Sequence, residues 1–186
     1  MVIYIFGKSG SGKSYLAKYL AEKLDNSIHI DLDSLNSDLM QMENVINFAL
    51  NLFGECVLDN NKLDNKKILS EIMQDNVKYL TWQKYMLKNC EEFLKNYITK
   101  TSFDYYIIDH MNAGILDVEI NNVLRIACVA DDITRKKRLI DRDNITDEVL
   151  IFRDQKYENA KSDIIYTDNT DKIIEYIQKT KRDYGK

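Results

Sequence analysis

The chain has 186 residues, of which 45% are hydrophobic and 30% are charged. These are the proportions of an ordinary globular protein, so they exclude wholesale disorder, and the length suits one compact α/β domain better than two full-size domains. The 26 basic and 30 acidic residues give a formal net charge of −4, which weighs against a surface devoted to binding nucleic acid.

The apolar stretches and the cysteines further limit the class of protein that this chain can be. The opening apolar run, residues 2–6, is far too short to span a bilayer, and no signal-peptide pattern precedes the motif that follows it. The three cysteines are widely spaced and form no Cys-x-x-Cys pair, so neither a disulfide framework nor a zinc site is expected. We therefore expect a cytoplasmic protein with reduced thiols and no membrane contact.

Strand and helix patterns alternate along the chain. Residues 2–6 are β-rich and run into a Gly/Ser cluster, after which apolar residues at helical spacing predict a helix over residues 13–24. Further strands are predicted over residues 27–31, 105–109, 123–129 and 164–166, and further helices over residues 45–52, 66–73, 77–98, 133–141, 147–160 and 172–181. This alternation predicts a five-stranded parallel sheet flanked by helices. We expect a single domain over residues 1–186, with a helical insertion over residues 34–102 and a lid over residues 135–162.

The Gly/Ser cluster satisfies the phosphate-loop pattern G-x-x-x-x-G-K-[ST], between a predicted strand and a predicted helix. Its residues are Gly7, Lys8, Ser9, Gly10, Ser11, Gly12, Lys13 and Ser14. The glycines let the backbone curl so that N–H groups face a phosphate chain, and the following helix adds its positive N-terminal end. Lys13 is expected to bridge the β and γ phosphates, and the Ser14 hydroxyl to ligate Mg²⁺. The motif therefore predicts ATP binding with Mg²⁺, and at this length a small P-loop kinase fits best.

Carboxylates follow two of the predicted strands. Asp31 and Asp33 close the second strand, and the carboxyl ends of neighbouring parallel strands face one ligand crevice. Because an alcohol acceptor must lose a proton, we expect Asp33 to be the base for a hydroxyl acceptor; the alternative is that it only caps a helix beginning at residue 34. Asp109, which ends the third strand, either holds Mg²⁺ through water or is a carboxylate without a role. The role of Asp31 stays open.

The arginines are clustered rather than spread. Five of the six lie within the 29 residues from Arg125 to Arg153, and none precedes Arg125. Nucleoside monophosphate kinases usually clamp the acceptor phosphate with arginines between the second and third strands, where this chain has only lysines, so that class is disfavoured. Arg138 and Arg142 suit a mobile lid that stabilises charge on the transferring phosphoryl group. A solvated basic helix face is the alternative, and it carries more weight for Arg125 and Arg135 than for the others.

In their order, these motifs resemble the dephospho-coenzyme A kinase family over nearly the whole chain. Besides the phosphate loop, the resemblance rests on the His-Ile-Asp-Leu-Asp segment at residues 29–33 and on segments at residues 52–69, 138–146 and 162–169. It implies a P-loop kinase fold and ATP-dependent phosphorylation of the ribose 3′-hydroxyl of a small-molecule substrate, dephospho-CoA, with an insertion that holds the coenzyme arm. The site residues that it implies are Asp33, Lys13 and Arg142 for catalysis, and the phosphate loop, Tyr15, Arg138, Arg142 and Asn169 for ATP.

The chain departs from the family's pattern at several places. Ser37 stands where the family has an arginine, Leu87-Lys88 replace a His-Pro pair, and residues 110–114 replace a Pro-Leu-Leu-x-Glu segment. These departures concern the acceptor more than ATP. They leave another small P-loop kinase, such as a nucleoside or (deoxy)nucleoside monophosphate kinase, as the main alternative and a non-catalytic nucleotide-binding module as a third. We expect a monomer or a weak homo-oligomer.

Overall fold

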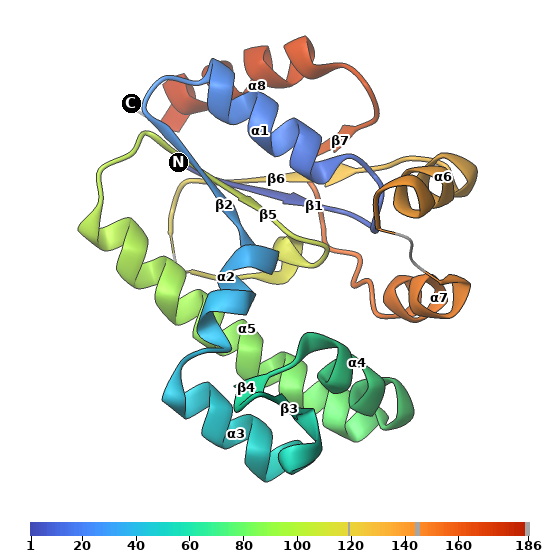
Figure 1. The fold of residues 1–186 in the computed structure, drawn as a ribbon. Coiled ribbons are helices and arrows are strands. Elements are labelled where there is room, and N and C mark those ends of the chain that lie inside the picture. The colour runs from blue at the N-terminus through green and yellow to red at the C-terminus, as the bar shows by residue number, and fades with distance from the viewer. Residues whose placement is uncertain (119, 144–145, 185–186) are drawn as a thin grey trace. The chain divides into compact units, whose positions relative to one another are not determined.

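A computed structural model describes residues 1–118, 120–143 and 146–184 (Figure 1). The chain divides into two compact units: residues 1–31 together with 97–186, and residues 32–96. In the part of the chain that the structure describes, no helix combines the length and the apolar character that crossing a membrane requires.

The first unit is built on a five-stranded sheet. Its strands are β1 (Val2–Phe6), β2 (Ser27–Asp31), β5 (Tyr105–Asp109), β6 (Val123–Cys128) and β7 (Ile164–Tyr166), in the spatial order β2-β5-β1-β6-β7. All four pairings are parallel. The predicted five-stranded parallel sheet is therefore confirmed, and β1 lies at its centre between β5 and β6.

Helices α1 (Lys13–Lys23) and α8 (Thr170–Tyr184) cover one face of this sheet (Figure 1). Each presents apolar side chains one helical turn apart, Leu16 and Leu20 in α1 and Ile173 and Ile177 in α8. These side chains are buried against alternate residues of the strands, such as Ile3. The helical periodicity of the sequence thus becomes the core on this side of the sheet.

The opposite face of β1 is covered by the chain that follows β5. Its short helix η2 (Ala113–Ile115) contacts β1, and Gly114 lies against the buried ring of Phe6. Two more helices of the first unit, α6 (Asp132–Asp143) and α7 (Asp147–Gln155), lie between β6 and β7 in the chain. The residues Asn144 and Ile145 of the predicted lid lie outside the described residues.

The second unit is mainly helical. Its helices are α2 (Leu32–Leu39), α3 (Glu43–Phe53), η1 (Glu55–Val57), α4 (Asn65–Gln74) and α5 (Asn76–Lys100), the last of which extends beyond the unit. Phe48 stacks on Tyr85 with ring centroids 3.7 Å apart, and Trp82 is buried against Phe53. These aromatic contacts form part of the core of the second unit.

A small hairpin in the second unit was not predicted. Strands β3 (Leu58–Asp59) and β4 (Lys62–Leu63) pair antiparallel around Asn60 and Asn61. Both asparagines have positive φ, 47° and 62°, as a two-residue hairpin turn requires. Asparagine tolerates this conformation better than most residues, so the Asn-Asn pair was the signal in the sequence.

The helix predicted over residues 147–160 is wrong in its last third, because α7 ends at Gln155. The buried side chain of Asn112 explains the ending. Its Nδ2 donates to the Lys156 carbonyl, and its Oδ1 accepts from the Glu158 N–H. These bonds join positions 44 and 46 residues apart and hold the chain after α7 in place, which helical periodicity does not reveal.

Replacing Gly114 with alanine should destabilise the first unit. A Cβ at this position would lie 2.7 Å from the Ala160 Cβ and 2.9 Å from the Phe6 ring. Such overpacking costs about 1–3 kcal/mol, measurable as a lower midpoint of urea unfolding. The double variant Gly114→Ala/Ala160→Gly should recover part of the loss. An unchanged midpoint in the single variant would contradict the close packing of η2 on β1.

Candidate active site

The phosphate loop turns sharply from β1 into α1, and its glycines carry that turn. Gly7, Gly10 and Gly12 all have positive φ, at 145°, 78° and 100°. At Gly7 a Cβ would lie 2.3 Å from the Cys128 carbonyl oxygen of β6, so only glycine fits there. The spacing of glycines in the sequence is therefore a direct consequence of how closely the loop passes its neighbours.

The polar groups of the loop suit a phosphate chain. The Lys13 Nζ donates to the Lys8 carbonyl at 3.2 Å, which keeps the ammonium group against the loop rather than out in solvent. The Ser11 hydroxyl is buried and has no hydrogen-bond partner among the described residues. The Lys13 ammonium group and the Ser11 hydroxyl lie beside a curled backbone. An anionic ligand bound here would satisfy both groups.

At the start of α1, Ser14 connects the loop to the end of β5. The Ser14 Oγ donates to Asp109 Oδ2 at 2.8 Å, and the His29 Nε2 of β2 is hydrogen bonded to the other carboxylate oxygen. Asp109 is buried, with 3% of its surface exposed. The sequence predicts Ser14 as a magnesium ligand and leaves Asp109 either a magnesium carboxylate or a carboxylate without a role. The structure brings these two side chains together.

The charge state of Asp109 follows from these contacts. Burial acts to raise its pKa, but the hydrogen bonds from His29 and Ser14, together with the electrostatic interactions with His29 and Lys13, outweigh burial. The pKa of Asp109 is therefore lowered from its usual range, and the group is an ionised carboxylate at neutral pH.

A hydroxyl and an ionised carboxylate are hard oxygen donors suited to Mg²⁺. The described residues contain no cluster of three or more His, Cys, Asp or Glu side chains able to hold a metal ion. Ser14 and Asp109 therefore fit an ion that takes its other ligands from phosphate oxygens and water, as Mg²⁺ does in nucleotide sites.

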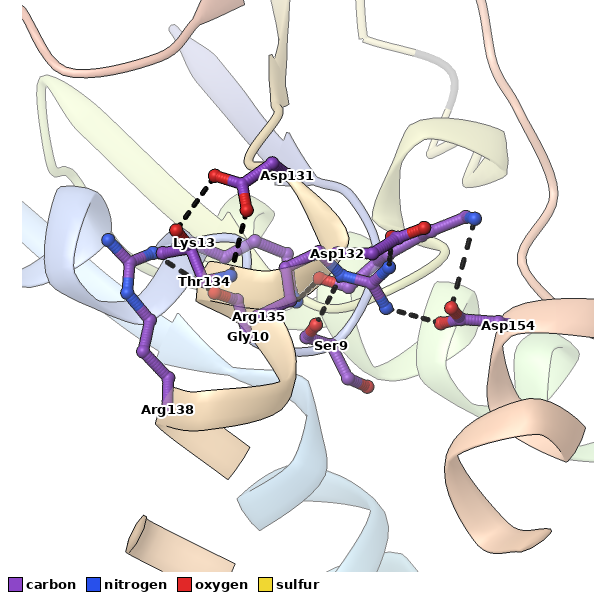
Figure 2. A network of polar contacts seen from close by, with 10 residues as sticks. Ser9, Gly10, Lys13, Asp131, Asp132, Thr134, Arg135, Arg138 and Asp154 are labelled. Atoms are coloured by element: carbon purple, nitrogen blue, oxygen red, sulfur yellow. Dashed lines mark hydrogen bonds and ion pairs between the residues drawn. The ribbon is translucent and has the colours of Figure 1, made fainter. Parts of the chain in front are cut away.

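Helix α6 packs directly on the outer side of the phosphate loop (Figure 2). Arg135 donates from Nε to the Ser9 carbonyl at 2.8 Å, and Arg138 donates from Nη1 to the Gly10 carbonyl at 3.1 Å. Asp131 stabilises the start of the helix by accepting from the Thr134 N–H at 2.8 Å. Arg138, which the sequence placed at the nucleotide, thus does contact the phosphate loop.

Helix α7 reaches the same loop through a carboxylate. Asp154 accepts from Arg135 Nη2 and lies 3.8 Å from the Lys8 Nζ (Figure 2). A cavity of about 430 Å³ opens here, lined by polar side chains of both helices together with Leu150 and Ile151. The predicted lid segment therefore contributes charged groups beside Lys8.

The other predicted site residues lie farther along the same elements. Tyr15 is 64% exposed on the first turn of α1, and Arg142 is exposed in the last turn of α6. Asn169 accepts from the Lys172 N–H and so caps α8, beside a cavity of about 420 Å³ between β7 and that helix. Their assignment to ATP stays a prediction.

Asp33 lies in the second unit, two residues after the end of β2. It is exposed and occupies the first turn of α2, which begins at Leu32. The alternative of an N-cap for a helix starting at residue 34 therefore does not match the structure. Its assignment as the catalytic base stays a prediction.

Sequence reasoning missed three residues that the structure places around the loop: His29, Arg135 and Asp154. A histidine within a strand and an arginine on a charged helix carry no local pattern that marks them. For Arg135 the expectation leaned further toward a solvated helix face than for Arg138 or Arg142, whereas only 2% of its surface is exposed.

A comparison with curated proteins extends the resemblance over the full length. The chain is 26% identical over 190 residues to dephospho-CoA kinase of Fusobacterium nucleatum subsp. nucleatum, covering 98% of this chain and 96% of that protein. The resemblance to the dephospho-coenzyme A kinase family is confirmed. No protein-family model matches the chain.

Solved structures with the same fold cover the chain equally well. The crystal structure of TT1252 from Thermus thermophilus has a TM-score of 0.76 at 16% identity and covers 96% of both chains. Shikimate kinase from Acinetobacter baumannii has a TM-score of 0.52 at 15% identity, covering 97% of this chain and 94% of that one. These matches confirm the P-loop kinase-type fold.

Replacing Asp109 with asparagine should destabilise the protein in a pH-dependent way. The folded-state pKa is depressed below 3.8, so the carboxylate's stabilisation is present above that value and is lost as pH falls through the folded pKa. At pH 7 the loss should be about 1–3 kcal/mol, and it should shrink below a pH of about 3.8. Urea unfolding of the wild-type protein and of Asp109→Asn, from pH 7 to below a pH of about 3.8, measures the difference in their free energies of unfolding.

The matched control is Glu22→Gln, which removes an exposed carboxylate of α1. It should leave stability nearly unchanged at every pH. A constant gap between the wild-type protein and Asp109→Asn across the pH range would show that Asp109 carries no coupled charge.

Proposed function

We propose that this protein transfers the γ-phosphoryl group of ATP to the ribose 3′-hydroxyl of dephospho-CoA. The comparisons support a kinase in the broad sense, and the identity of the phosphate acceptor is the part that we propose. The single observation that carries it is the full-length similarity to a dephospho-CoA kinase. It is supported by an acidic residue, Asp33, two residues after the end of β2. An acid at that point matches the base that the resemblance implies.

On the nucleotide side, the phosphate loop binds and orients ATP. Its curled backbone offers N–H groups to the phosphates, and Lys13 supplies a positive charge beside the Lys8 carbonyl. Ser14 and Asp109 would hold Mg²⁺, which when bound neutralises charge on the β and γ phosphates. These groups position the transferring phosphoryl group, and positioning with charge stabilisation is most of what phosphoryl transfer needs.

On the acceptor side, an alcohol differs from a nucleoside monophosphate in one respect. The hydroxyl must lose its proton during attack, whereas the phosphate acceptor is already ionised at neutral pH. Asp33 accepts that proton in our proposal. Arg138 and Arg142 of α6 add positive charge that stabilises the transferring phosphoryl group.

The main alternative is another small P-loop kinase. It is favoured by the departures from the family at Ser37, at Leu87-Lys88 and at residues 110–114, where substrate contacts of the family are replaced. In both cases the second unit, residues 32–96, would supply specificity. A coupled ADP-release assay with dephospho-CoA, nucleosides and nucleoside monophosphates separates the two, and turnover on nucleosides or their monophosphates without turnover on dephospho-CoA would overturn our assignment.

Replacing Lys13 with alanine should abolish most phosphoryl transfer without unfolding the protein. The variant loses the charge that bridges the β and γ phosphates, so the rate should fall by about a hundredfold or more. Lys18→Ala, which removes an exposed lysine from the same helix, is the matched control and should retain full activity. Wild-type turnover in Lys13→Ala would refute the phosphate-loop assignment.

Replacing Asp33 with asparagine tests the acceptor chemistry. The variant keeps the shape but loses the proton acceptor, so turnover on dephospho-CoA should fall about 10² to 10⁴-fold. The melting temperature should drop only slightly, because a carboxylate in a first helical turn contributes about 0.3–1 kcal/mol. Both quantities are measured on the purified variant, by the ADP-release assay and by thermal unfolding.

Asp38→Asn, an exposed change on the same helix, is the matched control and should leave the rate unchanged. If Asp33→Asn keeps its turnover on dephospho-CoA, Asp33 is not the base. If it loses turnover on dephospho-CoA but the wild-type protein prefers a nucleoside monophosphate, the alternative kinase is correct.

A further inference from the structure

Arg135 is the most deeply buried cationic side chain described in the protein, with only 2% of its surface exposed. Burying a guanidinium group costs several kcal/mol unless its charge and its donors are satisfied. The structure satisfies them with three partners from three segments: the Ser9 carbonyl of the phosphate loop, Asp132 of α6 and Asp154 of α7. A group this costly to bury, placed directly against the phosphate loop, calls for an explanation.

The bond to Ser9 acts on the backbone of the loop. Arg135 Nε donates to the Ser9 carbonyl at 2.8 Å. A trans peptide unit is planar, and its C=O and N–H point in opposite directions. Holding the Ser9 carbonyl outward, toward α6, therefore turns the Gly10 N–H toward the opposite side of the loop. That side is where a phosphate would be bound.

The packing around Gly10 prevents the loop from relaxing outward. A Cβ at Gly10 would lie 2.8 Å from the Arg135 carbonyl oxygen and 3.2 Å from the Leu139 Cγ. Helix α6 thus touches the loop backbone at Gly10 while its side chain Arg135 holds the preceding carbonyl. The same helix therefore limits the movement of the loop at Gly10 and holds the Ser9 carbonyl through a hydrogen bond.

The carboxylate partners fix the guanidinium plane. Asp132 accepts from Nη1 at 2.6 Å, and Asp154 accepts from Nη2, so all three sides of the fork are engaged. Asp154 also lies 3.8 Å from the Lys8 Nζ (Figure 2). Lysine could not make these three bonds at once, because it lacks the planar fork.

We propose that Arg135 is a positioning residue of the phosphate loop, which holds the Ser9–Gly10 peptide in its phosphate-binding orientation while Asp154 of α7 holds the guanidinium group from the other side. This rests on the proposed function only in taking a nucleotide phosphate chain as the ligand. The competing explanation is that Arg135 merely joins α6 to α7. The two differ in one measurable quantity: only positioning affects binding of phosphates more than binding of the nucleoside.

Isothermal titration of the full chain with MgADP and with adenosine separates these explanations. Arg135→Gln should weaken MgADP binding about tenfold or more, while adenosine binding should change less than about twofold. Arg135→Lys keeps the charge without the fork and should recover less than half of the lost MgADP affinity on a logarithmic scale. Lys137→Gln, an exposed change two residues along the same helix, is the matched control and should bind both ligands normally.

A drop in melting temperature with unchanged MgADP affinity in Arg135→Gln would overturn the inference, as would equal weakening for MgADP and adenosine. If Arg135→Gln does not fold, Arg135→Lys decides, because it keeps the buried positive charge and loses the planar fork that holds the Ser9 carbonyl. Selective weakening of MgADP by about threefold or more then supports positioning, and an unchanged affinity overturns it.

The outcome is separate from the acceptor question. A protein that phosphorylates no member of the acceptor panel but binds MgADP in an Arg135-dependent way refutes the proposed function and keeps this inference. If the protein phosphorylates dephospho-CoA but its Arg135→Gln variant binds MgADP normally, the proposed function stands and this inference is refuted.

Discussion

The phosphate loop turns from β1 into α1 in the narrow space that neighbouring segments leave for its backbone, and that space requires glycine. β6 approaches Gly7 so nearly that a Cβ there would lie 2.3 Å from the Cys128 carbonyl oxygen, and α6 approaches Gly10 in the same manner. Farther along, Ser14 is hydrogen bonded to Asp109 at the end of β5. The loop is therefore a junction between the central strand and its two neighbours, and its geometry derives from the order of strands in the sheet.

Buried charges of opposite sign lie on the two sides of that junction. Asp109 is ionised beside His29 and Ser14, and Arg135 is paired with Asp132 and Asp154. Each charge is compensated locally, which is what allows it to be buried at all. The Asp109 carboxylate lies against Ser14, the expected magnesium ligand. The Arg135 guanidinium group lies against the Ser9 carbonyl, on the side of the loop that packs on α6. A phosphate chain would therefore meet backbone N–H groups and Lys13.

The departures from the resembled family spare the phosphate loop. Ser37 and Leu87-Lys88 lie in the second unit and residues 110–114 lie in the first, whereas the phosphate loop matches its pattern at every position. ATP sites tolerate little change because backbone geometry dictates their residues. Acceptor sites depend on side chains, which can be replaced individually. This difference explains why the departures from the family concern the acceptor site more than the ATP site.

The sequence by itself determined the five strands, the phosphate loop and the amphipathic helices, because each depends on glycine spacing or on hydrophobic periodicity over neighbouring residues. The contact between Ser14 and Asp109 was left open, because the role of Asp109 was undecided and the hydrogen bond joins positions 95 residues apart. Only the tertiary structure decided the partners of His29 and Arg135, whose bonds to Asp109 and Ser9 join positions 80 and 126 residues apart. The end of α7 was likewise decided by Asn112, because a side chain from a distant segment competed with local helical preference and prevailed.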